Sequence, residues 1–355
     1  MSVDVTQETG DAGIEQGPST APRTSLPIGY GKRLMVVAGR ASQELGTKIG
    51  DRLGVGLTDA GLKTFTDGEV YCRYKESIRG ADMFIVQSTC GNEDAQMTVN
   101  DALMELLVMV EAAVGASAHR VIAVCPWYGY SRQDKKSAPR EPITARLVAK
   151  MLETAGIDRM LTMDLHAGQM QGFFSKPVDH MTAMPVLTQY VRDQIGGSGE
   201  DLVIISPDAG RVKLTRKFAQ KIGAPYALLE KERPAQQVAE IGYVIGDVKG
   251  KKAVIVDDII DTGGTLSAAA RTVLDEGASE VHAVATHGLF SGAAYETLGA
   301  SDLKSIVVTD TVPLRAGAPD LIQVLTSADI LTDSVRRIFT DDSVSEIFAG
   351  ENQLF

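Results

Sequence analysis

The sequence predicts an α/β fold of two stacked domains, each with a mainly parallel sheet flanked by helices. Amphipathic helical patterns alternate with short, nearly continuous apolar runs, which are typical of strands buried on both faces of a parallel sheet. The 355 residues correspond to two domains at roughly 150 residues each. The predicted strands are 33–39, 83–89, 120–127, 159–165, 201–206, 252–257, 280–286 and 305–311.

The first 31 residues differ from the rest of the chain. They combine scattered Gly, Pro, Ser and Thr with four acidic residues and one arginine, namely Asp4, Glu8, Asp11, Glu15 and Arg23. Such a segment buries too little apolar surface to offset the entropy lost on ordering. We therefore expect 1–31 to be a disordered tail.

The clearest helix is predicted over 99–110. Its apolar residues recur at helical spacing and are Val99, Ala102, Leu103, Leu106, Leu107 and Val110. Met104, Val108 and Met109 widen this stripe, which suggests burial on two sides, either in a deep core or at an interface.

Eight strands are many for one sheet of this type, so we expect a boundary between two domains near 175–185, where Pro177 and Pro185 interrupt the pattern. Connections between parallel strands are right-handed crossovers. The predicted domains are 32–180 and 181–330, followed by a C-terminal segment, 331–355.

Composition restricts the class of partner. The chain has 35 basic and 46 acidic residues, a net charge of −11, and an acidic surface repels nucleic-acid backbones. Its three cysteines show no C-x-x-C spacing, and it has neither a signal pattern nor an apolar stretch of about 18 residues. These features predict a cytoplasmic protein that contacts neither nucleic acid nor membrane. Small anionic substrates remain compatible if cations gather locally.

Ligands of such sheets gather at the carboxyl ends of the strands. The strongest motif, 253–265, is an apolar strand that leads into Asp257 and Asp258. A helix-opening loop follows, formed by Asp261, Thr262, Gly263, Gly264 and Thr265. The glycines allow a tight turn whose N–H groups can bind phosphate, while the acids can accept hydrogen bonds from sugar hydroxyls. Together they predict a ribose 5-phosphate site rather than an acidic surface turn.

Cations follow the predicted strand 120–127. Arg132, Lys135, Lys136 and Arg140 come shortly after this strand, together with Gln133. Their position at a strand exit favours triphosphate binding over a solvated charge run. The segment Phe65, Thr66, Asp67, Gly68 and Glu69 is equally consistent with a structural turn and with an adenine contact.

Two further pairs stand at strand ends. His166 and Asp208 each follow an apolar run, and they could share a Mg²⁺ held mainly by phosphate and water, although a lone histidine is more often structural. Lys231 and Arg233 have the i, i+2 spacing that points two cations to one side of an extended loop. From spacing alone, an exposed basic hairpin is the better interpretation of this second pair.

The strand–acid–acid–loop pattern resembles the signature of the phosphoribosyltransferase fold. Together, the motifs closely resemble the class I ribose-phosphate pyrophosphokinase (phosphoribosyl pyrophosphate synthetase) family, from about Lys32 to Phe348. Further matching segments are 76–80, 140–144, 171–174, 177–180, 244–250 and 286–288.

The resemblance implies transfer of the β,γ-diphosphoryl group of ATP to the 1-hydroxyl of ribose 5-phosphate, which gives 5-phosphoribosyl 1-pyrophosphate and AMP for nucleotide, histidine and tryptophan biosynthesis. The implied residue roles are catalysis by Lys231 and Arg233; ATP binding by Phe65, Asp67, Gly68, Glu69, Arg132 and Gln133; ribose 5-phosphate binding by Arg233, Asp257, Asp258, Asp261, Thr262, Gly263, Gly264 and Thr265; and Mg²⁺ binding by His166 and Asp208.

The resemblance also implies two phosphoribosyltransferase-like domains, with ATP on the N-terminal and ribose 5-phosphate on the C-terminal one. The segment 331–355 would pack back on the first domain. A homo-oligomer is expected, with dimers assembled to a hexamer and with ADP and phosphate as allosteric effectors. The alternatives are a non-catalytic regulatory relative and a base-utilising phosphoribosyltransferase. Glu232 and Arg211 depart from residues common in the family, where a basic residue and a glycine stand.

Overall fold

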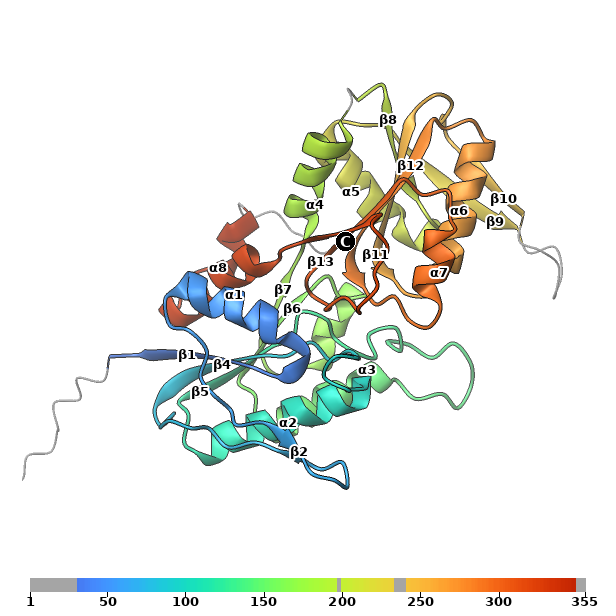
Figure 1. The fold of residues 1–355 in the computed structure, drawn as a ribbon. Coiled ribbons are helices and arrows are strands. Elements are labelled where there is room, and N and C mark those ends of the chain that lie inside the picture. The colour runs from blue at the N-terminus through green and yellow to red at the C-terminus, as the bar shows by residue number, and fades with distance from the viewer. Residues whose placement is uncertain (1–30, 197–198, 233–240, 349–355) are drawn as a thin grey trace, which may run out of the picture. The chain divides into compact units, whose positions relative to one another are not determined.

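The first sheet contains five parallel strands in the order β1-β4-β5-β6-β7. The computed structural model describes residues 31–196, 199–232 and 241–348 (Figure 1). The strands are Arg33–Ala38, Ala81–Val86, Arg120–Val124, Arg159–Met163 and Val178–Met181. The associated helices are α1 (Gln43–Leu53), α2 (Val99–Gly115) and α3 (Thr144–Ala155).

The second sheet has seven strands in the order β10-β9-β8-β11-β12-β13-β14, and only the pair β9–β10 is antiparallel. In chain order the strands are β8 (Leu202–Ser206), β9 (Tyr226–Glu232), β10 (Ile241–Ile245), β11 (Lys252–Ile260), β12 (Glu280–Gly288), β13 (Ser305–Thr309) and β14 (Ile322–Leu325). Its helices are α4 (Met184–Tyr190), α5 (Val212–Ile222), α6 (Gly264–Asp275) and α7 (Ala294–Gly299). The last helix, α8 (Ala328–Thr340), follows β14.

The expected α/β class with mainly parallel sheets is confirmed, and all eight predicted runs contain strands. The most informative difference is at β11, which continues to Ile260 because it pairs with β12 as far as Gly288. Asp257 and Asp258 therefore lie within the strand, and the predicted strand 252–257 was too short.

The two sheets share one apolar core. One face of the first sheet, including Phe84 and Leu161, belongs to the same buried cluster as Val254 and Val284 of the second sheet. The opposite face of the first sheet packs against α2 and α3, whereas that of the second packs against α6 and α7. Residues from Arg33 onward form one compact unit. The domain boundary at 180/181 stays a prediction.

Helix α2 confirms the predicted helical spacing, and its start is explained by a capping box between Thr98 and Asp101. Leu103, Leu106 and Val110 are buried, as expected for the apolar stripe. Met104 is 49% exposed, so the suggested burial on two sides does not extend to this residue within the chain.

Helix α8 lies beside α1, as the red and blue ribbons in Figure 1 show. An ion pair joins Arg52 Nε on α1 to Asp329 Oδ1 on α8 at 2.6 Å. Immediately after α8, Asp341 accepts a hydrogen bond of 2.9 Å from Arg120 of β5. The end of the chain that is described is thereby attached to the first sheet.

Candidate active site

The loop after β11 forms a turn that is suited to binding an anion. Gly263 has a φ of +79°, and a Cβ at this residue would lie 2.7 Å from Leu298 Cγ, so glycine is required here both for backbone conformation and for space. Helix α6 begins at Gly264, and its first N–H groups lack intrahelical partners. Thr262 and Thr265 are exposed beside these groups. Free N–H groups and threonine hydroxyls at a helix N-terminus are what a phosphate-binding loop needs, and phosphate binding by 261–265 stays a prediction.

A cavity of about 290 Å³ opens over this loop, and we call it the sugar-side cavity. The residues that line it include His166 after β6, Asp208 after β8, and Asp257, Asp258 and Asp261 of the β11 segment. Strand ends far apart in the chain, such as those at His166, Asp208 and Asp257, are thus brought together, as expected for parallel sheets.

Arg211 brings a positive charge to the acidic residues of the sugar-side cavity. Its Nε lies 3.2 Å from Asp257 Oδ1, and its Nη2 lies 2.7 Å from Asp258 Oδ1. The same Nη2 is 2.8 Å from His166 Nδ1, which in turn is 2.9 Å from Asp258 Oδ2. The sequence identified Arg211 only as a departure from the family pattern, because its three partners are distant in the chain.

The two neighbouring acids have opposite pKa shifts. Burial and the charge of Asp258 raise the pKa of Asp257 well above its usual value. Burial alone would also raise the pKa of Asp258, but the hydrogen bond with His166 and the charge of Arg211 lower it to about 2. Asp258 is therefore a carboxylate with a fixed negative charge, whereas Asp257 ionises with more difficulty.

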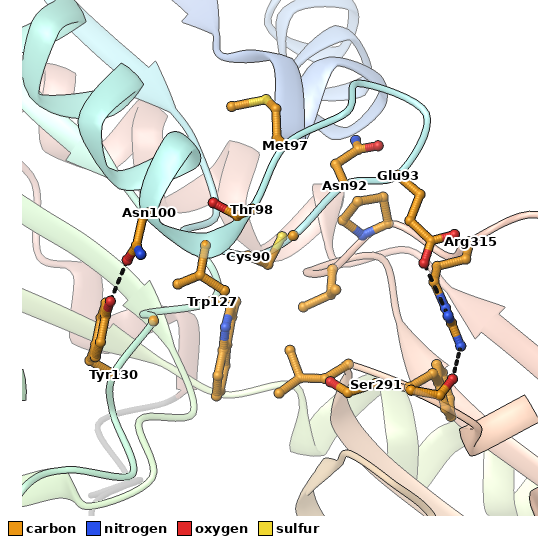
Figure 2. Close-up of a pocket in the computed structure, with 18 of the residues that line it drawn as sticks. Cys90, Asn92, Glu93, Met97, Thr98, Asn100, Trp127, Tyr130, Ser291 and Arg315 are labelled. Carbon is orange, nitrogen blue, oxygen red and sulfur yellow. Dashed lines mark hydrogen bonds and ion pairs between the residues drawn. The ribbon is translucent and has the colours of Figure 1, made fainter. Parts of the chain in front are cut away.

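A second cavity, of about 610 Å³, adjoins the first, and we call it the aromatic cavity. Figure 2 shows Trp127 and Tyr130 on one side and Ser291 and Arg315 on the other. Trp127 packs against His287 with ring centroids 4.8 Å apart, and Tyr130 donates a hydrogen bond to Asn100. Neither aromatic residue was among the predicted site residues, although Trp127 is the single tryptophan and ends a predicted strand.

Arg132 lines both cavities. Its guanidinium donates a hydrogen bond to Asp261, at the start of the phosphate-binding loop. Burial would raise the pKa of Asp261, but hydrogen bonds from Ser291 and Arg132 outweigh this effect and lower it. Gln133 lines only the aromatic cavity, and its Oε1 accepts a 2.6 Å hydrogen bond from Thr144.

The segment 65–69 forms the end of a hairpin between β2 (Lys63–Thr64) and β3 (Val70–Tyr71). Glu69 O accepts a 2.8 Å hydrogen bond from Phe65 N, and Gly68 has a φ of +96°. Phe65 is 44% exposed, and none of the residues 65–69 lines either cavity. Within one chain, the structure does not bring the predicted adenine contacts to Arg132 and Gln133.

The predicted catalytic pair falls at the edge of the described chain. The backbone of Lys231 belongs to β9 and is opposite Gly242 of β10, so the loop begins later than the sequence indicated. Arg233 lies outside the described residues.

His166 and Asp208 are the predicted Mg²⁺ ligands. Within 31–196, 199–232 and 241–348, no group of three or more His, Cys, Asp or Glu side chains could hold a metal by itself. Asp208 supplies a carboxylate, and His166 supplies an imidazole in the same cavity. This set fits a Mg²⁺ that is held mainly by substrate oxygens and water. No helix among the described residues is long and apolar enough to cross a membrane.

Comparisons with known proteins agree with this arrangement. Residues 34–156 match the N-terminal domain of ribose phosphate pyrophosphokinase, and 207–349 match the phosphoribosyl synthetase-associated domain. The chain is 47% identical to a ribose-phosphate pyrophosphokinase of Caldanaerobacter subterraneus over 90% of this chain and 99% of that protein. It is 45% identical to one from Bifidobacterium longum, over 89% and 93%.

A crystal structure of phosphoribosylpyrophosphate synthetase from Mycobacterium smegmatis is similar to this fold. The TM-score is 0.81 at 40% identity, and the match covers 87% of this chain and all of the other. Sequence and structure comparisons therefore lead to the same family.

Proposed function

The chain belongs to the ribose-phosphate pyrophosphokinase family, and from this premise we propose that it transfers the β,γ-diphosphoryl group of ATP to the 1-hydroxyl of ribose 5-phosphate. The products are 5-phosphoribosyl 1-pyrophosphate and AMP. The product would supply nucleotide, histidine and tryptophan biosynthesis in the cytoplasm. The observation that carries the proposal is the sugar-side cavity, where a phosphate-binding loop, an acidic strand end and Arg132 meet.

Ribose 5-phosphate would bind with its phosphate at the N-terminus of α6 and its hydroxyls toward Asp257. The loop from Asp261 to Thr265 offers N–H groups and threonine hydroxyls, which are suitable donors for a phosphate dianion. Asp257 is 30% exposed to the cavity and can accept hydrogen bonds from a sugar diol.

ATP would bind across the aromatic cavity, with its phosphates near Arg132. The volume of about 610 Å³ is in the range of small-molecule sites, and Trp127, Tyr130 and Gln133 offer apolar and polar contacts to a nucleotide. Because Arg132 lines both cavities, it lies where a phosphate chain bound in one cavity would meet a sugar bound in the other.

His166 and Asp208 would hold Mg²⁺, which when bound neutralises charge on the phosphate oxygens. The sugar 1-oxygen attacks the β-phosphorus, the bond from that phosphorus to the oxygen bridging it to the α-phosphorus breaks, and AMP leaves with that oxygen. The hydroxyl proton passes to solvent. Positioning and charge neutralisation supply most of the acceleration, and Lys231 and Arg233 would contribute cations to it.

We also propose that a second copy of the chain completes the nucleotide site. Phe65, Asp67, Gly68 and Glu69 lie on an exposed hairpin that lines neither cavity, so an adenine contact from these residues requires a neighbouring copy. This supports a homo-oligomer, which we propose to be dimers assembled to a hexamer, with ADP and phosphate as effectors. The proposed domains remain 32–180 and 181–330, with 331–355 packed on the first.

Co-expression of two inactive variants tests the shared site. Phe65→Asp removes the proposed adenine contact, and Lys231→Ala removes a proposed catalytic cation. Mixed assemblies should recover activity that neither variant has alone, because some sites then combine two intact contributions. If mixed assemblies of normal size recover no activity, a site shared between copies is contradicted.

Incubation with ATP, Mg²⁺ and ribose 5-phosphate tests the activity itself. AMP should form only when ribose 5-phosphate is present, and ³¹P NMR should show the pyrophosphate ester. A base-utilising phosphoribosyltransferase would release no AMP under these conditions. A folded protein that gives no AMP would favour a non-catalytic relative.

A further inference from the structure

The base of the sugar-side cavity contains a chain of contacts that the proposed substrate roles do not explain. Asp258 Oδ1 accepts from Arg211 Nη2 at 2.7 Å, and Asp258 Oδ2 lies 2.9 Å from His166 Nδ1. Arg211 Nη1 also donates to the backbone oxygen of His166 at 3.3 Å. Both carboxylate oxygens of Asp258 are therefore engaged by protein groups.

Of the two neutral tautomers of His166, only the Nδ1–H form gives both carboxylate oxygens of Asp258 a donor. Arg211 Nη2 lies 2.8 Å from Nδ1 and can only donate, whereas the carboxylate oxygen of Asp258 at 2.9 Å can only accept. If Nδ1 accepted from Arg211, its lone pair would face the carboxylate of Asp258. Arg211 donates to the other oxygen of that carboxylate in either arrangement. If Nδ1–H donates to Asp258, both carboxylate oxygens have a donor, Nε2 keeps a free lone pair, and Arg211 Nη2 is a neighbour of Nδ1 but not a donor to it.

The exposure of the two acids agrees with separate roles. The side chain of Asp258 is 7% exposed, whereas that of Asp257 is 30% exposed. A sugar hydroxyl can therefore reach Asp257 in the arrangement observed, but it would have to displace Arg211 or His166 to reach an oxygen of Asp258.

We propose that Asp258 and Arg211 are positioning residues for His166: Arg211 orients the Asp258 carboxylate, and the carboxylate holds the imidazole as the Nδ1–H tautomer with Nε2 available. This inference rests on the proposed function for its purpose, since a histidine that ligates a metal usually donates its other ring N–H to such a partner. It also removes Asp258 from the residues that bind the sugar.

The tautomer can be measured directly on the full chain without substrates or metal. In protein with ¹⁵N-labelled histidine, in alkaline buffer, the ring nitrogen shifts distinguish the two neutral tautomers, and His166→Gln assigns the signal among five histidines. We expect the Nδ1–H form in the wild type. Finding the Nε2–H form would overturn the proposal.

Asp258→Asn should reverse the tautomer. Arg211 can only donate, so it would hold the amide oxygen and turn the amide NH₂ toward His166 Nδ1, which must then accept. In Asp258→Asn combined with Arg211→Met, the amide can rotate, and the Nδ1–H form should return at least in part. An unchanged tautomer in the single variant would overturn the role of Asp258, and no return in the double variant would overturn that of Arg211.

Kinetics separate positioning from sugar binding. Asp258→Asn should lower kcat about 10–100-fold with little change in KM for ribose 5-phosphate, whereas Asp257→Asn should mainly raise that KM. Lys213→Met, which removes an exposed cation of α5, is the matched control and should change neither the tautomer nor kcat. A raised KM with unchanged kcat in Asp258→Asn would return Asp258 to the sugar site.

The proposed function and the positioning role of Asp258 and Arg211 can be contradicted independently. Absence of AMP from wild-type protein would contradict the proposed function but leave the tautomer measurement intact. AMP formation together with the Nε2–H tautomer would overturn only the positioning role.

Discussion

Arg132, in the loop after β5 of the first sheet, donates a hydrogen bond to Asp261, in the loop after β11 of the second sheet. This contact joins the two proposed substrate cavities at the point where transfer between them would occur. Partial burial alone would raise the pKa of Asp261. Because Ser291 and Arg132 both donate hydrogen bonds to its carboxylate, the pKa is lowered instead.

Replacement of Arg132 should affect both substrates. Arg132→Met removes a cation from both cavities and leaves Asp261 without that partner, so we expect kcat/KM for ATP and for ribose 5-phosphate each to fall about 100-fold. Steady-state measurement of AMP formation checks this prediction. Arg146→Met, on the exposed surface of α3, is the control. A loss confined to one substrate would contradict the bridging position.

Lys231→Ala should lower turnover far more than it weakens substrate binding, because the cation is proposed to act on charge that develops during transfer. The expected fall in kcat is about 100-fold or more, with KM values nearly unchanged. Single-turnover assays and equilibrium binding of ATP separate the two effects. Lys249→Ala, at an exposed lysine, should behave as wild type. Unchanged turnover in a folded Lys231→Ala protein would remove Lys231 from catalysis.

The two glycines of the phosphate-binding loop should respond differently to alanine. Gly263→Ala forces a side chain into a left-handed φ of +79° and within 2.7 Å of Leu298, so we expect a loss of about 2 kcal/mol in the free energy of unfolding. Gly264→Ala meets nothing within 4 Å and should change that free energy by no more than about 0.5 kcal/mol. Urea denaturation of both variants checks the difference, and equal stabilities would contradict the loop geometry.

Glu280 should make stability depend on acidic pH. A hydrogen bond from Lys304, supported by Lys252 and opposed by burial, lowers the pKa of Glu280 from 4.5 to about 2. A lowered folded-state pKa stabilises the protein above pH 4.5, and the contribution disappears as the pH falls toward 2. Because Lys304 is largely exposed, we expect about 1 kcal/mol at neutral pH.

Denaturation of Glu280→Gln from pH 7 down to pH 3 measures this contribution. The variant should be less stable than wild type at neutral pH, and the difference should shrink on acidification. Glu111→Gln, at an exposed residue of α2, should show no such convergence. A constant difference across this range would show that Glu280 stabilises the fold by other means.

Much of the fold could be predicted because its strands and helices are marked by residues that lie close together in the sequence. Buried parallel strands are marked by apolar runs, so each of the eight predicted runs contains a strand, and the spacing of Leu103, Leu106 and Val110 identified α2. Short edge strands such as Val178–Met181 and Ile322–Leu325 were missed because few residues in them are both apolar and consecutive. The length of β11 was underestimated because its last residues pair with a strand whose extent is not a local property.

The sequence by itself determined the family, the glycine-containing turn at 261–265 and the strand ends that carry polar residues, since each of these depends on residues close together in the chain. Only the tertiary structure decided that Asp258 meets His166 and Arg211, that Arg132 reaches Asp261, and that the hairpin at 65–69 lies apart from both cavities. The physical reason is that hydrogen bonds and charge interactions act over a few ångströms in space, and the packing of two sheets on one shared core decides which distant residues come that close.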